Sequence, residues 1–150
     1  MTDRLLVHAT AVAIDAGAVL LRGPTGCGKS DLALRLIDGG ARLIADDQAV
    51  LLRRDDHIQV RAPATIVGLL EVRGVGILRL DTFPEAPLAL VVDLVPAAQV
   101  ERLPEPRCET VLGLAVPLIA LAPFAVSAAA KLRFARRTLA TAGQATHRVW

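Results

Sequence analysis

A run of eight residues near the N-terminus limits the folds that this chain can adopt. The run fits the pattern G-x-x-x-x-G-K-[ST] in full and consists of Gly23, Pro24, Thr25, Gly26, Cys27, Gly28, Lys29 and Ser30. An apolar stretch at 18–21 precedes it as a buried strand would, and a helical pattern at 31–37 follows it. A strand that leads through a glycine-rich loop into a helix directs backbone N–H groups and the positive end of the helix dipole at one point. The sequence therefore predicts an α/β fold with a polyphosphate site at this loop.

Two side chains of the loop have expected tasks if the polyphosphate belongs to a nucleotide. Lys29 is expected to reach the β- and γ-phosphates, and the Ser30 hydroxyl is expected to ligate Mg²⁺. The alternative is an ordinary glycine-rich turn before a helix, with Lys29 exposed to solvent. The full match and its setting between a strand and a helix favour the nucleotide site.

The composition indicates a single domain over 1–150 and argues against several kinds of partner. Hydrophobic residues make up 53% of the chain and aromatic residues only 3%, so an aliphatic core with strands covered on both faces is expected. The net charge of +2 is too small to indicate a nucleic-acid partner. No apolar run is long enough to span a membrane and no secretory signal is recognisable, so the cytoplasm is the expected compartment. Two cysteines, Cys27 and Cys108, are too few for a metal cluster.

Apolar runs and turn signals predict the other elements. Helices are predicted from the loop to the glycine pair at 39–40 and over 126–140. Residues 69–77 form an apolar segment that two glycines and two opposite charges interrupt. The tail at 141–150 has no packing pattern and is predicted to be disordered or to pair with another subunit. Strands are predicted at 5–14, 18–22, 42–45 and 88–95, with a hairpin from 49–53 and 57–61 and a short apolar run at 116–121.

Two adjacent acids follow the apolar strand at 42–45, where a Walker B acid would stand. If this strand and the one before the loop lie side by side in a parallel sheet, Asp46 and Asp47 face the γ-phosphate. Successive strand residues point to opposite faces, so one acid is expected to hold Mg²⁺ or its bound water while the other accepts a proton. The residues alone do not say which acid does which, and a solvated Asp-Asp turn is the alternative.

Three further residues have a functional and an ordinary interpretation. Glu71 lies in an apolar context, which is costly for a carboxylate without a cation. It is either paired with Arg73 or a second Mg²⁺ ligand, with Arg73 on a phosphate. Judged by their neighbours alone, His8 and Arg102 are an ordinary strand histidine and an ordinary surface arginine.

From about residue 8 to residue 102 the sequence resembles the catalytic domain of the HPr kinase/phosphorylase family, and three parts of it carry the resemblance. They are the glycine-rich loop, the strand end Leu43-Ile44-Ala45-Asp46-Asp47, and the segment Leu70-Glu71-Val72-Arg73-Gly74-Val75-Gly76-Ile77. The last segment resembles the family signature L-E-[IV]-R-G-[LV]-G-I and is far more specific than the loop. The resemblance implies a P-loop-containing mixed β-sheet with flanking helices, similar to the HPr kinase and phosphoenolpyruvate carboxykinase-like fold. It also implies a short form without the N-terminal domain of longer members.

The resemblance further implies a reaction and residue roles. The γ-phosphate of ATP is transferred, with Mg²⁺, to a serine of HPr, the small phosphocarrier protein of the phosphotransferase system. His8 and Lys29 match active-site residues, and Asp47 matches the proton acceptor in phosphorylation. Ser30 and Glu71 match the Mg²⁺ ligands. Family members form hexamers, so a homo-oligomer is expected. Arg102 matches a catalytic arginine. Four further residues match supporting positions, namely Asp46, Arg73, Gly74 and Gly76.

The sequence also departs from the family pattern and leaves two alternatives. The family's Gly-Arg-Asn-type segment, tied to dephosphorylation, is replaced by the residues at 122–131, so the kinase reaction is implied more firmly than the phosphorylase reaction. A small-molecule kinase is the first alternative, although no arginine-rich lid is recognisable. A non-catalytic module that only binds ATP is the second, and it does not need Asp47, Glu71 and Arg102 together.

Overall fold

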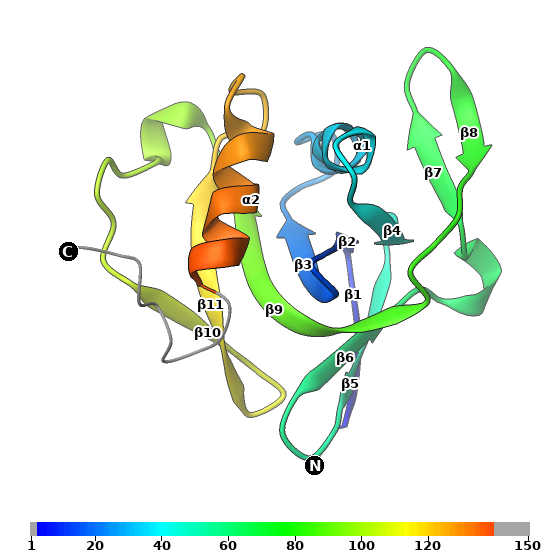
Figure 1. Ribbon diagram of the computed structural model, residues 1–150, viewed down its shortest axis with the longest axis horizontal. Helices are drawn as coiled ribbons and strands as arrows, with labels where there is room; N and C mark the ends of the chain where they lie inside the picture. The colour runs from blue at the N-terminus through cyan, green and yellow to red at the C-terminus, as the bar shows by residue number, and fades with distance from the viewer. Residues whose placement is uncertain (1–2, 140–150) are drawn as a thin grey trace.

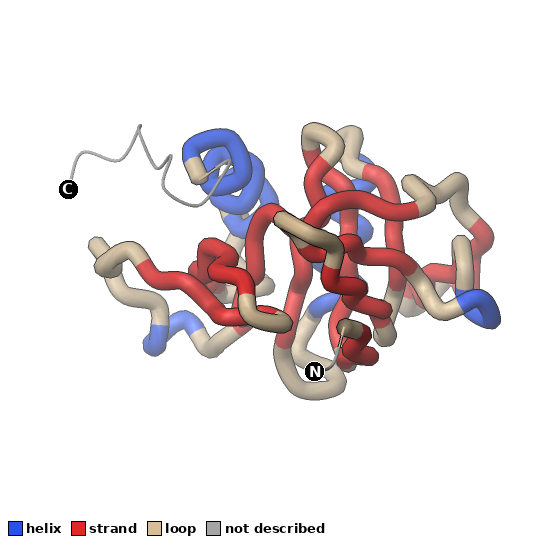
Figure 2. The backbone as a smooth tube through the Cα atoms, turned by 90° about the horizontal axis from the view of Figure 1, so that it is seen from below, coloured by secondary structure: helices blue, strands red, loops and turns tan. Residues whose placement is uncertain are grey.

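The computed structural model describes residues 3–139, which fold into a curled sheet, a separate hairpin and two helices (Figure 1). Within the described residues, nine strands form the large sheet in the order β1-β5-β6-β9-β3-β2-β4, with β10 and β11 joined to it through β9. The strands curl round instead of lying in one plane (Figure 2). The elements are β1 (Arg4–Val7), β2 (Ala9–Ile14), β3 (Gly17–Arg22), α1 (Lys29–Asp38), β4 (Arg42–Ala45), β5 (Ala49–Arg53), β6 (Ile58–Arg61), β7 (Leu69–Val72), β8 (Gly76–Arg79), β9 (Glu85–Leu94), β10 (Arg107–Val111), β11 (Leu114–Leu121) and α2 (Ala128–Thr138), with short 3₁₀ turns η1 (Ala64–Ile66) and η2 (Ala97–Gln99).

The long strand β9 organises the sheet and brings one edge of it to the glycine-rich loop. Its first residues pair antiparallel with β6, and its later residues pair parallel with β3 on one side and β11 on the other. In Figure 1 it curves beneath β3 as a long green ribbon. Parallel neighbours end at the same edge of a sheet, so β3, β9 and β11 all end where the loop leaves β3. The predicted mixed sheet is confirmed.

The predicted strand at 5–14 is wrong as a single element, because the chain bends at His8. Before the bend β1 pairs with β5, and after it β2 pairs with β3 on one edge and β4 on the other. A strand has only two edges, and both edges of β2 are occupied, so β1 must leave the line of β2 to reach β5. The bend therefore turns His8 out of the strand interior.

Helix α1 begins at Lys29 and ends as the glycine pair predicts. Gly40 has a φ of 114°, a left-handed conformation that glycine adopts without strain. Its N–H donates to Ile37 O at 3.0 Å, and the N–H of Ala41 donates to Leu36 O at 3.0 Å. These two bonds form a Schellman motif, which satisfies carbonyls that the helix end leaves without partners.

The core consists of aliphatic side chains on both faces of β3, as the composition predicts. Leu20 lies inside the curl of the sheet, where many partners are alanines. Val19 and Leu21 point to the other face and pack against Leu32 of α1 and Leu132 of α2. Because neighbouring strand residues alternate between faces, β3 is buried on both sides and holds the loop on a rigid support.

Other predicted elements differ from the structure in detail. The segment at 69–77 forms the hairpin of β7 and β8, which projects from the body of the molecule (Figure 1). β10 was not predicted, and β11 begins two residues before the apolar run at 116–121. The predicted tail at 141–150 and the end of the predicted second helix lie outside the described residues. Among the residues described, neither helix has the length and apolar character needed to cross a membrane.

Candidate active site

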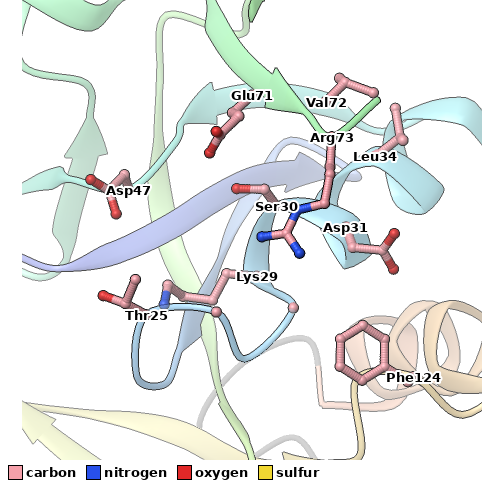
Figure 3. A pocket seen from close by; sticks show the side chains of 12 residues that line it. Thr25, Lys29, Ser30, Asp31, Leu34, Asp47, Glu71, Val72, Arg73 and Phe124 are labelled. Carbon is pink, nitrogen blue, oxygen red and sulfur yellow. The ribbon is translucent and has the colours of Figure 1, made fainter. Parts of the chain in front are cut away.

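A cavity of about 360 Å³ lies against the glycine-rich loop. The loop and the first turn of α1 form its floor, and Asp47 lies at one end. Glu71, Val72 and Arg73 line another wall, and Phe124 closes the far end (Figure 3). Three segments that are distant in sequence therefore meet at the loop that the sequence singles out.

The loop holds Lys29 in a position suited to an anion. Its side chain is only 6% exposed, and the ammonium donates hydrogen bonds to Gly23 O at 2.7 Å and Pro24 O at 3.0 Å. No carboxylate within 3–139 forms an ion pair with this ammonium. A buried cation that has only neutral partners favours a negatively charged ligand beside it. The Lys29 environment therefore supports the predicted phosphate site.

Asp46 is the centre of a buried hydrogen-bond network. Its Oδ1 accepts from the Ser30 hydroxyl at 2.7 Å and from the Thr10 hydroxyl at 2.9 Å, and its Oδ2 accepts from the Glu71 N–H at 3.3 Å. The residue is 8% exposed. The acid thus ties β2, the start of α1 and β7 together and orients the hydroxyl at the predicted Mg²⁺ position. This is the expected place of a Walker B acid, and a solvated turn at this residue is ruled out.

Asp47 has a different environment from its neighbour. Its φ of 69° turns the chain directly after Asp46, so its carboxylate leaves the buried network and faces the cavity. Its Oδ1 lies 2.6 Å from His8 Nε2, and the two side chains are 69% and 46% exposed. A carboxylate paired with an imidazole at the mouth of a cavity can exchange a proton with an incoming hydroxyl. The structure therefore separates the two acids, which the sequence alone leaves equivalent.

The strand arrangement that places Asp46 and Asp47 near the loop differs from the prediction. The strand β4 is not beside β3, because β2 lies between them and pairs antiparallel with both. β3 and β4 consequently run in the same direction without touching. The acids therefore reach the loop across β2, and Thr10 of β2 fills the intervening space with a hydroxyl.

Thr10 is a site residue that the sequence patterns do not predict. It is fully buried, donates to Asp46 and accepts a hydrogen bond from the Asp47 N–H at 3.3 Å. The sequence does contain one indication of this role, because Thr10 is the only residue with a hydroxyl in the apolar run at 9–13. A buried hydroxyl needs a hydrogen-bond partner, so a polar neighbour of Thr10 could have been expected. Thr10 thus aligns both acids.

Replacing Thr10 by valine is expected to lower the free energy of unfolding by about 1–2 kcal/mol. The change keeps the shape of the side chain but leaves the Asp47 N–H without its acceptor. Chemical denaturation measures the loss, and Thr10→Ser, which keeps the hydroxyl, is the matched control. Equal stability of the valine variant and the unaltered protein would contradict the alignment role.

Glu71 and Arg73 both take part in the cavity wall. Leu70 and Val72 are buried against Leu43, and Glu71 between them points the other way. Figure 3 shows its carboxylate directed toward the space between Asp47 and Ser30, with the Arg73 guanidinium reaching over the loop. The alternative Glu71–Arg73 ion pair does not form among the described residues.

The oxygen donors at this point fit a magnesium ion. The Ser30 hydroxyl and the Glu71 carboxylate face the cavity, and Asp46 supports the hydroxyl. Within the described ranges no three His, Cys, Asp or Glu side chains are grouped closely enough to hold a metal. Mg²⁺ commonly takes only one or two carboxylates together with waters and substrate phosphates. The donor set therefore suits Mg²⁺ arriving with a nucleotide.

Not all predicted residues meet at the cavity. Arg102 is exposed, follows η2 and does not line the cavity, so the prediction that it is catalytic has no support from this arrangement. Gly74 lies in the turn of the hairpin next to Arg73, and Gly76 is the first residue of β8, with φ values of 88° and 130°. Phe124 and Leu34 line the cavity although no sequence pattern predicts them.

An ion-pair cluster stabilises the sheet edge directly before the loop. Arg22 at the end of β3 donates to both carboxylate oxygens of Asp93 in β9 at 2.8 and 3.1 Å, and also to Glu109 in β10. The hydrogen bond to Asp93 is the main cause that raises the pKa of the Arg22 guanidinium. Because Gly23 follows Arg22 immediately, this cluster fixes where the loop begins.

Comparisons with known proteins agree on one family. The model of the HPr Serine kinase C-terminal domain matches residues 1–125. An HPr kinase/phosphorylase of Limosilactobacillus reuteri is 34% identical over 133 residues, covering 81% of this chain and 42% of that protein. One of Burkholderia lata is 37% identical over 132 residues, covering 81% and 41%. The chain thus spans about two-fifths of the length of these relatives.

The fold has a match among solved structures. The structure of the Hpr(Ser) kinase/phosphatase from Coxiella burnetii superposes with a TM-score of 0.79 at 25% sequence identity. The match covers 89% of this chain and 88% of that chain. The predicted fold is therefore confirmed.

Proposed function

The chain belongs to the HPr Serine kinase C-terminal domain family, and on that premise we propose that it transfers the γ-phosphate of ATP to a serine of HPr. One observation carries the proposal most strongly. Lys29 and Asp47 line the same cavity, and the exposed Asp47 carboxylate is paired with His8. A module that only binds a nucleotide does not need the His8–Asp47 pair beside the phosphate site.

The proposed mechanism assigns each of these residues a step. The serine oxygen attacks the γ-phosphorus while Asp47 accepts the hydroxyl proton, and ADP leaves as the bond between the γ-phosphorus and the bridging oxygen breaks. His8, in contact with Asp47 Oδ1, holds the carboxylate in position. Lys29 and the N–H groups of the loop stabilise the charge that develops on the transferred phosphoryl group. Arg73 reaches the same region from the hairpin and adds positive charge.

The oxygen donors in the cavity support the use of Mg²⁺ and ATP as cofactors. Ser30 and Glu71 would hold Mg²⁺, and Asp46 would keep the Ser30 hydroxyl oriented toward it. The bound ion would neutralise the phosphates of ATP. We place the reaction in the cytoplasm, where both ATP and the protein substrate are found.

The role of Arg102 and the assembly of the protein are parts of the same proposal. Arg102 matches a catalytic arginine, yet it lies outside the cavity. That role requires movement of its segment or a second copy of the chain that supplies the residue. A homo-oligomer, hexameric as the family resemblance implies, would provide such copies, and light scattering measures the assembly.

Phosphate transfer is tested directly with HPr. The chain is incubated with HPr, γ-labelled ATP and Mg²⁺, and mass spectrometry locates the label. Labelling of one HPr serine is expected, and omission of Mg²⁺ is expected to prevent it. Subsequent addition of inorganic phosphate tests reversal, which the replaced segment at 122–131 is expected to make weak. ATP binding without labelling would contradict the kinase proposal.

A further inference from the structure

Phe124 presents an aromatic ring to solvent at the end of the cavity. Its side chain is 69% exposed, in a chain with only three phenylalanines, one tryptophan and no tyrosine. A single exposed apolar residue is common on protein surfaces. This ring differs from such residues because it lines the nucleotide cavity and because the structure holds it in place.

The turn that carries Phe124 is anchored to α1. Arg35 donates hydrogen bonds to the carbonyl oxygens of Pro123 and Ala125, the second at 3.4 Å. The guanidinium is itself held by Asp31, one turn earlier in α1, at 3.0 Å. The backbone carbonyls on both sides of Phe124 are thus bound to the helix that begins at the phosphate-binding loop.

The ring also lies against the loop. A Cβ added to Gly28 would stand 2.9 Å from Phe124 Cζ, closer than such atoms approach, and in a tight contact of 3.2 Å with Pro123 Cβ. Only a residue without a side chain therefore lets the ring come so near. The edge of the ring contacts the loop, while the rest of the side chain remains exposed beside the cavity (Figure 3).

The position of Phe124 relative to the other groups indicates what it contacts. Asp47 lies at one end of the cavity, Lys29 and Ser30 lie in the middle, and Phe124 lies at the other end (Figure 3). A triphosphate with its γ-phosphate near Asp47 and its β-phosphate near Lys29 must extend its nucleoside away from Asp47. That direction leads along the loop to Phe124.

We propose that the Phe124 ring is the stacking surface for the base of the bound nucleoside triphosphate. The inference rests on the proposed ATP site and adds the group that binds the base. Stacking of a base on an aromatic ring contributes about 1–3 kcal/mol, which corresponds to roughly a 5- to 150-fold change in Kd. The interaction needs no hydrogen bonds to the base edge, so it does not distinguish adenine from guanine.

The test compares binding of ATP with binding of tripolyphosphate, which has no base. Phe124→Leu keeps an apolar side chain of similar size against Gly28 and removes the aromatic face. We expect it to weaken ATP and GTP about tenfold, measured by calorimetry, and to leave tripolyphosphate unchanged. Phe124→Trp is expected to retain ATP affinity. Phe134→Ala, at a ring 62% exposed on α2, is the matched control and is expected to change neither ligand.

Two results would overturn the inference. Equal loss of ATP and tripolyphosphate would show that the ring only supports the loop, and unchanged ATP affinity would show that it does not contact the base. Both results leave the kinase proposal intact. Conversely, if the unaltered protein binds ATP and fails to label HPr, the kinase proposal fails while the loss of ATP affinity in Phe124→Leu still supports stacking.

Discussion

Replacing Lys29 by methionine is expected to lower phosphate transfer to HPr about 10²- to 10³-fold. Lys29 supplies a buried positive charge that is held by two loop carbonyls and has no carboxylate partner in the described structure. Methionine keeps much of the apolar volume and removes the charge, so the phosphates lose the group that stabilises them in the transition state. Initial rates of HPr labelling at saturating ATP measure the effect.

The chain offers a matched control for this change. Its other lysine, Lys131, is exposed on α2, and Lys131→Met is expected to leave the labelling rate unchanged. Thermal unfolding of both variants separates loss of charge from loss of fold. A folded Lys29→Met variant that labels HPr at the unaltered rate would remove the loop from the mechanism.

Replacing Asp47 by asparagine is expected to lower transfer about 10²- to 10⁴-fold, with ATP affinity nearly unchanged. The amide oxygen can still accept a hydrogen bond from His8, so the local geometry is kept. The amide cannot accept the proton of the attacking hydroxyl at neutral pH. The side chain is 69% exposed, so the substitution is not expected to disturb folding. Labelling rates and calorimetric ATP binding are measured in parallel.

The Asp46→Asn and Asp47→Asn variants are expected to differ in stability and in ATP binding. Asp46→Asn places an amide where three donors converge on a buried carboxylate, so both stability and Mg²⁺-dependent ATP binding are expected to fall. Asp55→Asn, in the exposed turn between β5 and β6, is the neutral control. If Asp47→Asn lost binding and transfer in the same proportion, Asp47 would be a binding residue and its assignment as proton acceptor would be wrong.

Much of the local structure follows from short-range patterns. The loop pattern at 23–30 predicts the turn from β3 into α1, and the glycine pair at 39–40 predicts the end of the helix. The hairpin of β5 and β6 follows from its turn residues at 54–56. These features depend on neighbouring residues and on backbone conformations that glycine and aspartate favour, so the local sequence suffices to predict them.

The candidate site is only partly predictable, because its residues come from segments that are distant in sequence. Lys29, Ser30, Asp47 and Glu71 were predicted as site residues, and all line one cavity. Arg102 matches the family pattern equally well but lies elsewhere, since a residue's type does not say where its segment packs. Phe124 carries no motif, and Arg35, far away in sequence, binds the turn that places it at the cavity.

The junction of a strand, a glycine-rich loop and a helix can be read from the amino-acid sequence, because that information lies within a few consecutive residues. The folded chain is needed to show that β2 separates β3 from β4 and that the chain bends at His8. The same holds for the burial of Asp46 and for the exposure of Asp47 to the cavity. These outcomes depend on which strand edges pair across dozens of residues. Thr10 and Ser30 reach the same carboxylate oxygen of Asp46 from different elements, and no local pattern encodes that meeting.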